Sequence, residues 1–137
     1  MAIHPHERLE SRQWKNYIFR GRFKIVSGAL LIDFRQSADF SGYCMNIHPI
    51  AQIEFTERNE VGDRGNIYGG NLMLIELNKW YDFKIIVKED YLLITIEEMT
   101  LVYRDPNPIL FGSINIGGAG QDNSQILLDN LSVSRIS

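Results

Sequence analysis

Cysteine is almost absent from this sequence of 137 residues, since Cys44 is the single one. One thiol forms no internal disulfide, which excludes the small secreted scaffolds that disulfides hold together. Cys44 lies in an apolar stretch, so we expect a buried and unreactive thiol. The other soft metal ligands are His4, His6 and His48, whose spacing matches no common zinc site, so we expect no structural zinc.

An excess of positive charge is missing as well. Lys and Arg number 14 against 17 Asp and Glu, which gives a net charge of -3. We therefore expect no nucleic-acid partner, although a local basic patch of Arg20, Arg22 and Lys24 stays open. No apolar run approaches the roughly 20 residues that a membrane-spanning helix needs, so we expect no membrane partner.

The N-terminal residues 1–10 have no apolar core of the kind found in signal peptides. If the chain is a complete protein, this predicts a cytoplasmic location. If the chain is a domain taken from a longer exported protein, an extracellular location is expected. The sequence leaves these two alternatives open, and the compartment unassigned.

Alternation of apolar and polar residues is the main pattern that the sequence does contain. It is clearest in the segment 77–105, where Tyr81, Phe83, Ile85 and Val87 alternate with a mostly polar set. This period of two predicts two or three consecutive antiparallel strands. No segment has the apolar spacing of a helix of convincing length.

The same alternation, interrupted by turn residues, continues along the chain. Further strands are predicted at about 14–26, 29–35, 43–47, 50–58, 72–77, 110–116 and 125–136. Nine or ten short strands at this spacing favour an all-β fold, an antiparallel two-sheet sandwich or a barrel. We expect a flexible lead-in over residues 1–12 and one β-sandwich domain over 13–137. Tyr43 is expected to take part in the core.

Five short stretches carry a resemblance to a known family. They are Phe34-Arg35, Gly42-Tyr43, Lys79-Trp80-Tyr81 with Phe83-Lys84 and Val87, Phe111-Gly112-Ser113-Ile114, and Leu128-Asp129-Asn130-Leu131-Ser132-Val133. Their order over residues 14–136 is similar to that of the concanavalin A-like, laminin-G-like β-sandwiches. The nearest type is the jelly-roll module of bacterial glycan-processing proteins and carbohydrate-binding appendages.

This resemblance implies a jelly-roll fold and a glycan ligand. It implies that Trp14 and Trp80, which begin strands, seal the edge of the core instead of contacting ligand. It also implies that Asp129-Asn130 is a structural feature, in which side chains bond the backbone at a bulge or strand crossing. The chain departs from the family in two places. Few residues precede Trp14, where the family has strands, and the turn that usually carries Asp-Gly reads Glu97-Glu98-Met99.

Catalysis is not expected. Glycoside hydrolysis needs two carboxyl groups that flank the scissile bond. The nearest pairs are Glu54 with Glu57 and Glu97 with Glu98, and neither has the spacing of the related sandwich hydrolases. Adjacent residues of a regular strand point to opposite faces, so Glu97 and Glu98 cannot act together.

Calcium requires clustered oxygen ligands. Asp63 with Asn66 and Asn71, or Asp122 with Asn123, offers such oxygens within glycine-rich segments. The alternative is that these are turn residues that bond their own backbone. We assign no cofactor or metal, and keep Asp63 and Asp122 as calcium candidates.

Sugar recognition combines an aromatic ring with planar polar side chains. The segment 59–71 holds four glycines and reads as the longest loop, where binding residues concentrate. Tyr68 in this segment is either an exposed stacking ring or an anchor on the core, and Asn66 and Asn71 are expected beside it.

The polar faces of the early strands supply the other candidates. They are Arg20, Arg22, Asp33, Arg35, Asn46, His48, Gln52 and Glu54, of which Arg20, Arg35, Asn46, His48 and Glu54 are the predicted ligand-binding residues. If these strands are neighbours in one sheet, they form either a binding face or a plain solvated face. We expect Arg35 to pair with Asp33 or a loop carboxylate.

Two functions remain. The first is a non-catalytic carbohydrate-binding domain, which the resemblance implies. The second is a domain for protein interaction or assembly, including self-association, which predicts an exposed apolar patch or an uncovered edge strand.

Overall fold

The computed structural model describes residues 2–3, 6–9, 15–36, 42–49, 53–58, 64–70, 74–106, 108–118 and 124–136, with the backbone alone for 2–3, 6–9, 58 and 64–70. Twelve strands lie in these residues, which confirms the all-β prediction. Within them, no helix has the length and apolar character needed to cross a membrane.

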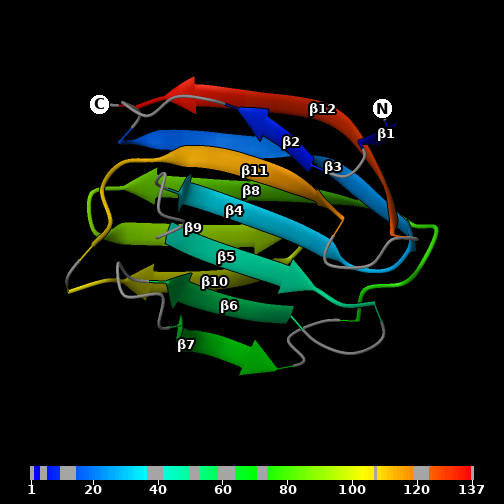
Figure 1. Cartoon of the computed structure of the whole chain (residues 1–137), viewed down its shortest axis with the longest axis horizontal. Coiled ribbons are helices and arrows are strands. Elements are labelled where there is room, and N and C mark those ends of the chain that lie inside the picture. The colour runs from blue at the N-terminus through cyan, green and yellow to red at the C-terminus, as the bar shows by residue number, and fades with distance from the viewer. Residues whose placement is uncertain are drawn as a thin grey trace.

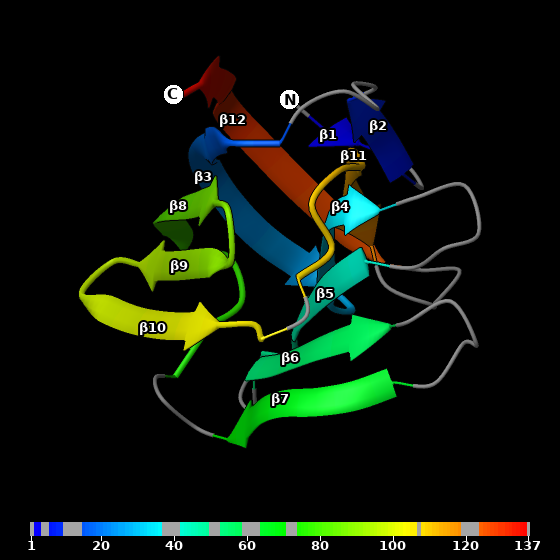
Figure 2. The ribbon, with the colours of Figure 1, turned by 90° about the vertical axis from the view of Figure 1, so that its left-hand side faces the viewer.

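The strands form two antiparallel sheets of six strands each (Figure 1). Sheet A has the order β1 (Ala2–Ile3), β12 (Gln125–Arg135), β3 (Tyr17–Ser27), β8 (Trp80–Lys88), β9 (Tyr91–Ile96) and β10 (Met99–Arg104). Sheet B has the order β2 (His6–Leu9), β11 (Ser113–Gly118), β4 (Leu30–Gln36), β5 (Gly42–Ile47), β6 (Ile53–Arg58) and β7 (Arg64–Gly70). The view turned by 90° shows the sheets as two layers of a sandwich (Figure 2).

The core lies between the two layers because each strand turns alternate side chains inward. Rings from both sheets fill it. Phe23 of β3 stacks on Tyr81 of β8 with 5.5 Å between ring centroids, and Phe34 of β4 stacks on Tyr43 of β5 at 5.6 Å. The exposed fraction of Tyr43 is 1%, which confirms its predicted place in the core.

Arg35 joins the two sheets. Its backbone has φ 49°, a left-handed conformation that a non-glycine residue rarely adopts, and its side chain is fully buried. The guanidinium donates to the carbonyl oxygens of Lys15 at 2.7 Å, Glu89 at 2.6 Å and Ile109 at 2.9 Å. Burial lowers the pKa of Arg35, but a guanidinium stays protonated in proteins. The predictions that Arg35 pairs with a carboxylate and that it binds ligand are therefore wrong.

The backbone of Arg35 also explains why residue 112 is a glycine. A Cβ at Gly112 would collide with the Arg35 backbone, so the chain before β11 can approach β4 only with hydrogen at this position. The Tyr17 hydroxyl of β3 accepts a hydrogen bond from the Arg35 amide at 3.2 Å. Arg35 is thus fixed at its backbone and at its side chain by both layers.

The N-terminal residues differ from the predicted lead-in. β1 pairs with β12 and β2 pairs with β11, so each sheet gains an edge strand within residues 2–9. Strands of two and four residues are too short to show a clear alternation of apolar and polar residues.

The segment after β6 also differs from the prediction. The predicted loop 59–71 contains β7, which pairs with β6 over Arg64–Gly70. The predicted strand at 72–77 is absent from its described part, since residues 74–76 have no regular structure and a turn follows at 77–78. Ile75 nevertheless packs in the core with an exposed fraction of 2%.

Trp80 lies outside the core. It is half-buried on the outer face of sheet A, opposite Lys24, and the Arg22 guanidinium carbon lies 5.0 Å from the centre of its ring. The prediction that Trp80 seals the core is therefore wrong, and Trp14 lies outside the described residues. The prediction of a bulge at Asp129-Asn130 is confirmed: the register with β3 shifts there, and Asp129 Oδ1 accepts the Asn130 amide at 2.9 Å.

Candidate ligand-binding face

Polar side chains gather on the outer face of sheet B, which faces away from the core. They come from four neighbouring strands or their ends. We call this set the polar face: Asp33 and Gln36 from β4, Cys44, Asn46 and His48 from β5 and the residue after it, Glu54 and Thr56 from β6, and Asn115 from β11.

The register of the strands explains why these residues meet. Asn115, Asp33, Cys44 and Thr56 are successive cross-strand partners from β11 to β6. A second row places Asn46 opposite Glu54. Because partners in antiparallel strands share a face, each row crosses the sheet on its outer side.

Hydrogen bonds connect the β11–β4 side of the polar face. The Asn115 amide donates to Gln36 Oε1, and the Gln36 amide donates to Asp33 Oδ2 at 3.4 Å. These bonds fix the orientation of two amide groups. The polar face therefore presents an ordered array here instead of independent side chains.

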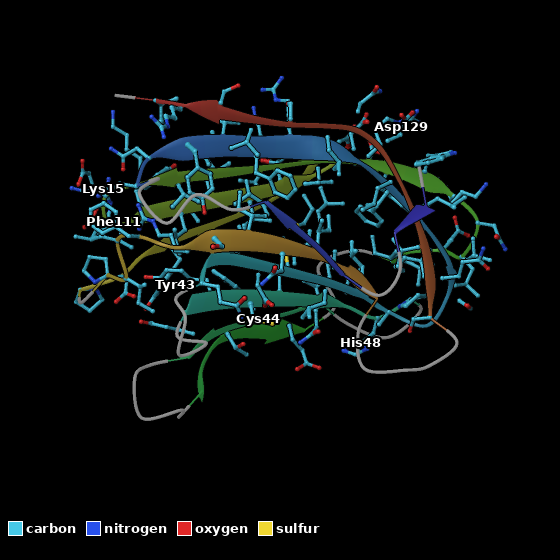
Figure 3. All side chains as sticks on the ribbon, turned by 45° about the horizontal axis from the view of Figure 1, so that its top comes forward. Lys15, Tyr43, Cys44, His48, Phe111 and Asp129 are labelled. Atoms are coloured by element: carbon cyan, nitrogen blue, oxygen red, sulfur yellow. The ribbon has the colours of Figure 1, made fainter. Side chains whose placement is uncertain are left out.

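A second group lies on β5 and β6. His48 Nε2 is 3.3 Å from Glu54 Oε1, and the Asn46 amide lies 3.7 Å from Cys44 Sγ, a weak contact. Cys44 is half-buried and points to the outer face, so the prediction of a buried thiol is wrong. Figure 3 shows Cys44 and His48 on the ribbon of this sheet.

Thr56 adds a polar group with unused capacity. Its Oγ1 is buried and has no hydrogen-bond partner within the described part of the chain. A buried hydroxyl without a partner costs about 1–3 kcal/mol, so this atom favours an additional bond.

The structure brings together three of the predicted ligand-binding residues, Asn46, His48 and Glu54. It separates Arg20 from them, because β3 belongs to sheet A while β4, β5 and β6 belong to sheet B. The condition for a single face, that all the early strands are neighbours in one sheet, is therefore not met, and Arg22 lies on sheet A with Arg20.

Other predicted residues lie outside the part of the chain whose side chains the structure describes. Tyr68 and Asn66 are on the backbone of β7, opposite Phe55 and Thr56, and their side chains are not described. Asn71, Gln52, Asp63, Asp122 and Asn123 fall outside the described residues. Their ligand-binding and calcium roles stay predictions. In the described ranges, no three His, Cys, Asp or Glu side chains are grouped as a metal site.

Glu54 and Glu57, the pair of carboxylates that the sequence spacing argued against as catalytic groups, are on opposite sides of sheet B. Glu54 lies opposite Asn46 on the outer face, whereas Glu57 lies opposite Tyr43. Glu57 bonds Asp105, which is buried and also accepts the Tyr43 hydroxyl at 2.7 Å. Burial and the bond to Asp105 raise the pKa of Glu57 to about 7. This cluster is a contact between the layers and does not reach the polar face.

Asn115, Gln36 and Thr56 are members of the polar face that the sequence did not indicate. The alternation in 110–116 puts Asn115 at an outward position, but it does not show which strand lies beside it. β11 lies next to β4, about 80 residues away in the chain, and local patterns carry no information on such a pairing.

Comparison with known proteins supports the fold. No family model matches the chain, and no curated protein matches it in sequence. Among solved structures, the carbohydrate-binding module CBM66 from Bacillus subtilis has a TM-score of 0.67 at 17% identity, over 88% of this chain and 75% of that one. Sheep galectin-11, in complex with glycerol, has a TM-score of 0.74 at 10% identity, over 96% and 98%. A human galectin-16 variant has 0.70 at 13% identity, over 94% of both chains.

Proposed function

We propose that this jelly-roll β-sandwich is a non-catalytic carbohydrate-binding domain and that the polar face of sheet B is its binding surface. The observation that carries the proposal is the gathering of ordered amide, carboxylate and imidazole groups from four strands on one outer face. The structural neighbours, a carbohydrate-binding module and galectins, support the ligand class.

The chemistry of the polar face fits a neutral sugar. Sugar hydroxyls both donate and accept, and the Asn46 amide can do both while Asp33 and Glu54 accept. The polar face, as defined, has two carboxylates and no Lys or Arg, so an anionic ligand would be repelled. A ring that stacks on the sugar would add to these hydrogen bonds. Tyr68 of β7 is the cross-strand partner of Phe55, a core residue, so we do not count it as part of the polar face.

Isothermal titration tests this proposal after a neutral oligosaccharide has been selected from a glycan array. Asn46→Ala removes a hydrogen-bonding group worth about 1.4 kcal/mol, so affinity should fall about tenfold. Glu54→Gln should also weaken binding. Glu98→Gln is the matched control, because Glu98 is exposed at the β9–β10 turn. If no neutral glycan binds, or if Asn46→Ala binds as tightly as the wild type, the proposal is wrong.

A second function, assembly with another copy of this chain, has one observation in its favour. Ile18, Ile86, Leu93 and Val102 are successive cross-strand partners on the outer face of sheet A. We call them the apolar row. Val102 is 53% exposed and the others are half-buried. A concentration-dependent dimer in sedimentation that Val102→Lys abolishes would support assembly, and a monomer at all concentrations would contradict it.

A further inference from the structure

Sheet A has its own polar site on the side away from the core. A depression with a volume of about 390 Å³ lies over β3, β8, β9 and β12. Its polar lining includes Arg20, Arg22, Asp82, Lys84, Glu97 and Asn130. None of these residues belongs to the polar face, which is on the opposite layer of the sandwich.

The bulge in β12 shapes one wall of this depression. The register with β3 shifts between Asp129 and Ser132, opposite Gly21. Asn130 has φ 55° at this point, and its side chain is exposed at the depression. Asp129 is labelled in Figure 3. The bulge thus places an amide group beside the charged side chains of β3 and β8.

Two basic side chains lie opposite each other in the depression. Arg20 and Lys84 are direct cross-strand partners on β3 and β8, and no ion pair of either joins the described residues. The depression also contains two carboxylates, and each has a partner other than Arg20 and Lys84. Asp82 Oδ1 pairs with Arg22 Nε at 3.2 Å, and Glu97 Oε1 accepts the Asp82 amide at 2.8 Å.

This arrangement is unfavourable in the absence of a ligand. Like charges directly opposite each other on neighbouring strands repel and lower the stability of a sheet. A bound anion removes this repulsion, and a guanidinium offers two parallel N–H groups to a carboxylate or sulfate. The hydroxyl of Thr95, the cross-strand partner of Lys84 on β9, is a further donor in the depression.

We propose that the depression binds a carboxylate or sulfate oxyanion, free or carried by a sugar, between Arg20 and Lys84. Asn130 and Thr95 bond the remaining oxygens or hydroxyls of the ligand. This site is on sheet A and takes an anionic ligand, whereas the proposed function places a neutral ligand on sheet B. The two proposals can therefore be tested independently of each other.

Amide NMR titrations of the intact chain test this site. The probes are glucuronate, glucose 6-sulfate, sodium sulfate and, as the neutral control, methyl glucoside. The anionic probes should shift the amide signals of Arg20, Lys84 and Thr95, and methyl glucoside should leave them in place. The relative affinities of glucuronate and glucose 6-sulfate identify the preferred oxyanion. A sugar-borne sulfate that binds more tightly than sodium sulfate identifies a sugar as its carrier.

Variants distinguish specific binding at Arg20 and Lys84 from nonspecific electrostatic attraction. Lys84→Gln should weaken binding of the anionic probes, and the double variant Arg20→Gln with Lys84→Gln should weaken it at least tenfold. Lys88→Gln removes the same charge from the same face of β8, outside the depression, and should leave binding unchanged. In the absence of ligand, Arg20→Gln should raise the Tm, because the repulsion is removed; this readout also shows that the variant folds. Absent shifts, or equal losses in Lys88→Gln and Lys84→Gln, would overturn the proposal.

Discussion

The two outer faces of the sandwich are built on the same scaffold but have opposite chemistry. The polar face of sheet B has amides, a hydroxyl, an imidazole and two carboxylates, and several of these groups are ordered by mutual hydrogen bonds. Sheet A instead has the apolar row, with the cations Arg20 and Lys84 beside it. The difference shows that a sheet's inner face determines the fold, while its outer face is free to specialise.

The difference also follows from the topology. β3 carries three basic residues, and β4 to β6 carry the two acidic members of the polar face. These strands are consecutive in the chain but belong to different layers. Charges that are close in sequence are therefore placed on opposite sides of the molecule, where they serve separate surfaces.

The largest expected effect comes from the residue that holds both faces in place. Arg35→Met leaves the carbonyl oxygens of Lys15, Glu89 and Ile109 without their buried donor. We expect a loss of about 3–5 kcal/mol in the free energy of unfolding. Urea denaturation measures it. Arg104→Met, at an exposed residue of β10 that pairs with Asp90 at 3.1 Å, is the control and should cost less than about 1 kcal/mol. Similar losses in both variants would show that Arg35 does not join the layers.

An effect of intermediate size is expected from ionic strength, which should change ligand affinity differently at the two faces. Raising NaCl from about 0.02 M to about 0.3 M shortens the distance over which charges act, so oxyanion affinity at Arg20 and Lys84 should fall about threefold or more. Affinity of a neutral glycan for the polar face should change less than about twofold, because hydrogen bonds to hydroxyls involve no net charge on the ligand. Equal salt dependence of the two ligands would contradict the division between the faces.

The smallest expected effect concerns pH and the inner side of β6. Glu57 has a pKa of about 7 in the folded chain, above its ordinary value of 4.5. The folded chain then binds more protons than the unfolded chain between these values, so stability falls as pH rises from about 4.5 to about 7. The Tm should therefore decrease slightly from pH 5 to pH 8, and the decrease should be smaller in Glu57→Gln. Glu54→Gln, on the outer side of the same strand, should retain the decrease of the wild type.

The sequence predicted the strands in which alternation is regular. β8, β9 and β10 fall within the segment 77–105, where apolar residues recur at every second position. β7 escaped prediction because Gly65, Gly69 and Gly70 interrupt any alternation, and its strand conformation comes from pairing with β6. Trp80 is in phase with Asp82 in the same alternation and lies on the outer face, which the expectation of a core-sealing tryptophan did not take into account.

The candidate site was predictable only where it depends on local pattern. Asn46 and Glu54 were identified from the alternation within their strands, and they meet because β5 and β6 form a hairpin. Arg35 has the parity of an outward residue together with Asp33, but its left-handed backbone turns it inward. Asn115 needs the pairing of β11 with β4, and Arg20 needs the assignment of β3 to the other sheet. These are properties of the whole fold and leave no local signal.

Mapping the site of a neutral oligosaccharide by amide NMR tests the central claim most directly. The claim is that the polar face of sheet B binds a neutral glycan. Addition of the oligosaccharide selected on the array should shift the amide signals of Asn46, Thr56 and Asn115. The signals of Thr95 and Asn130 on sheet A should stay unchanged. Shifts confined to sheet A, or no shift on either sheet, would contradict the account.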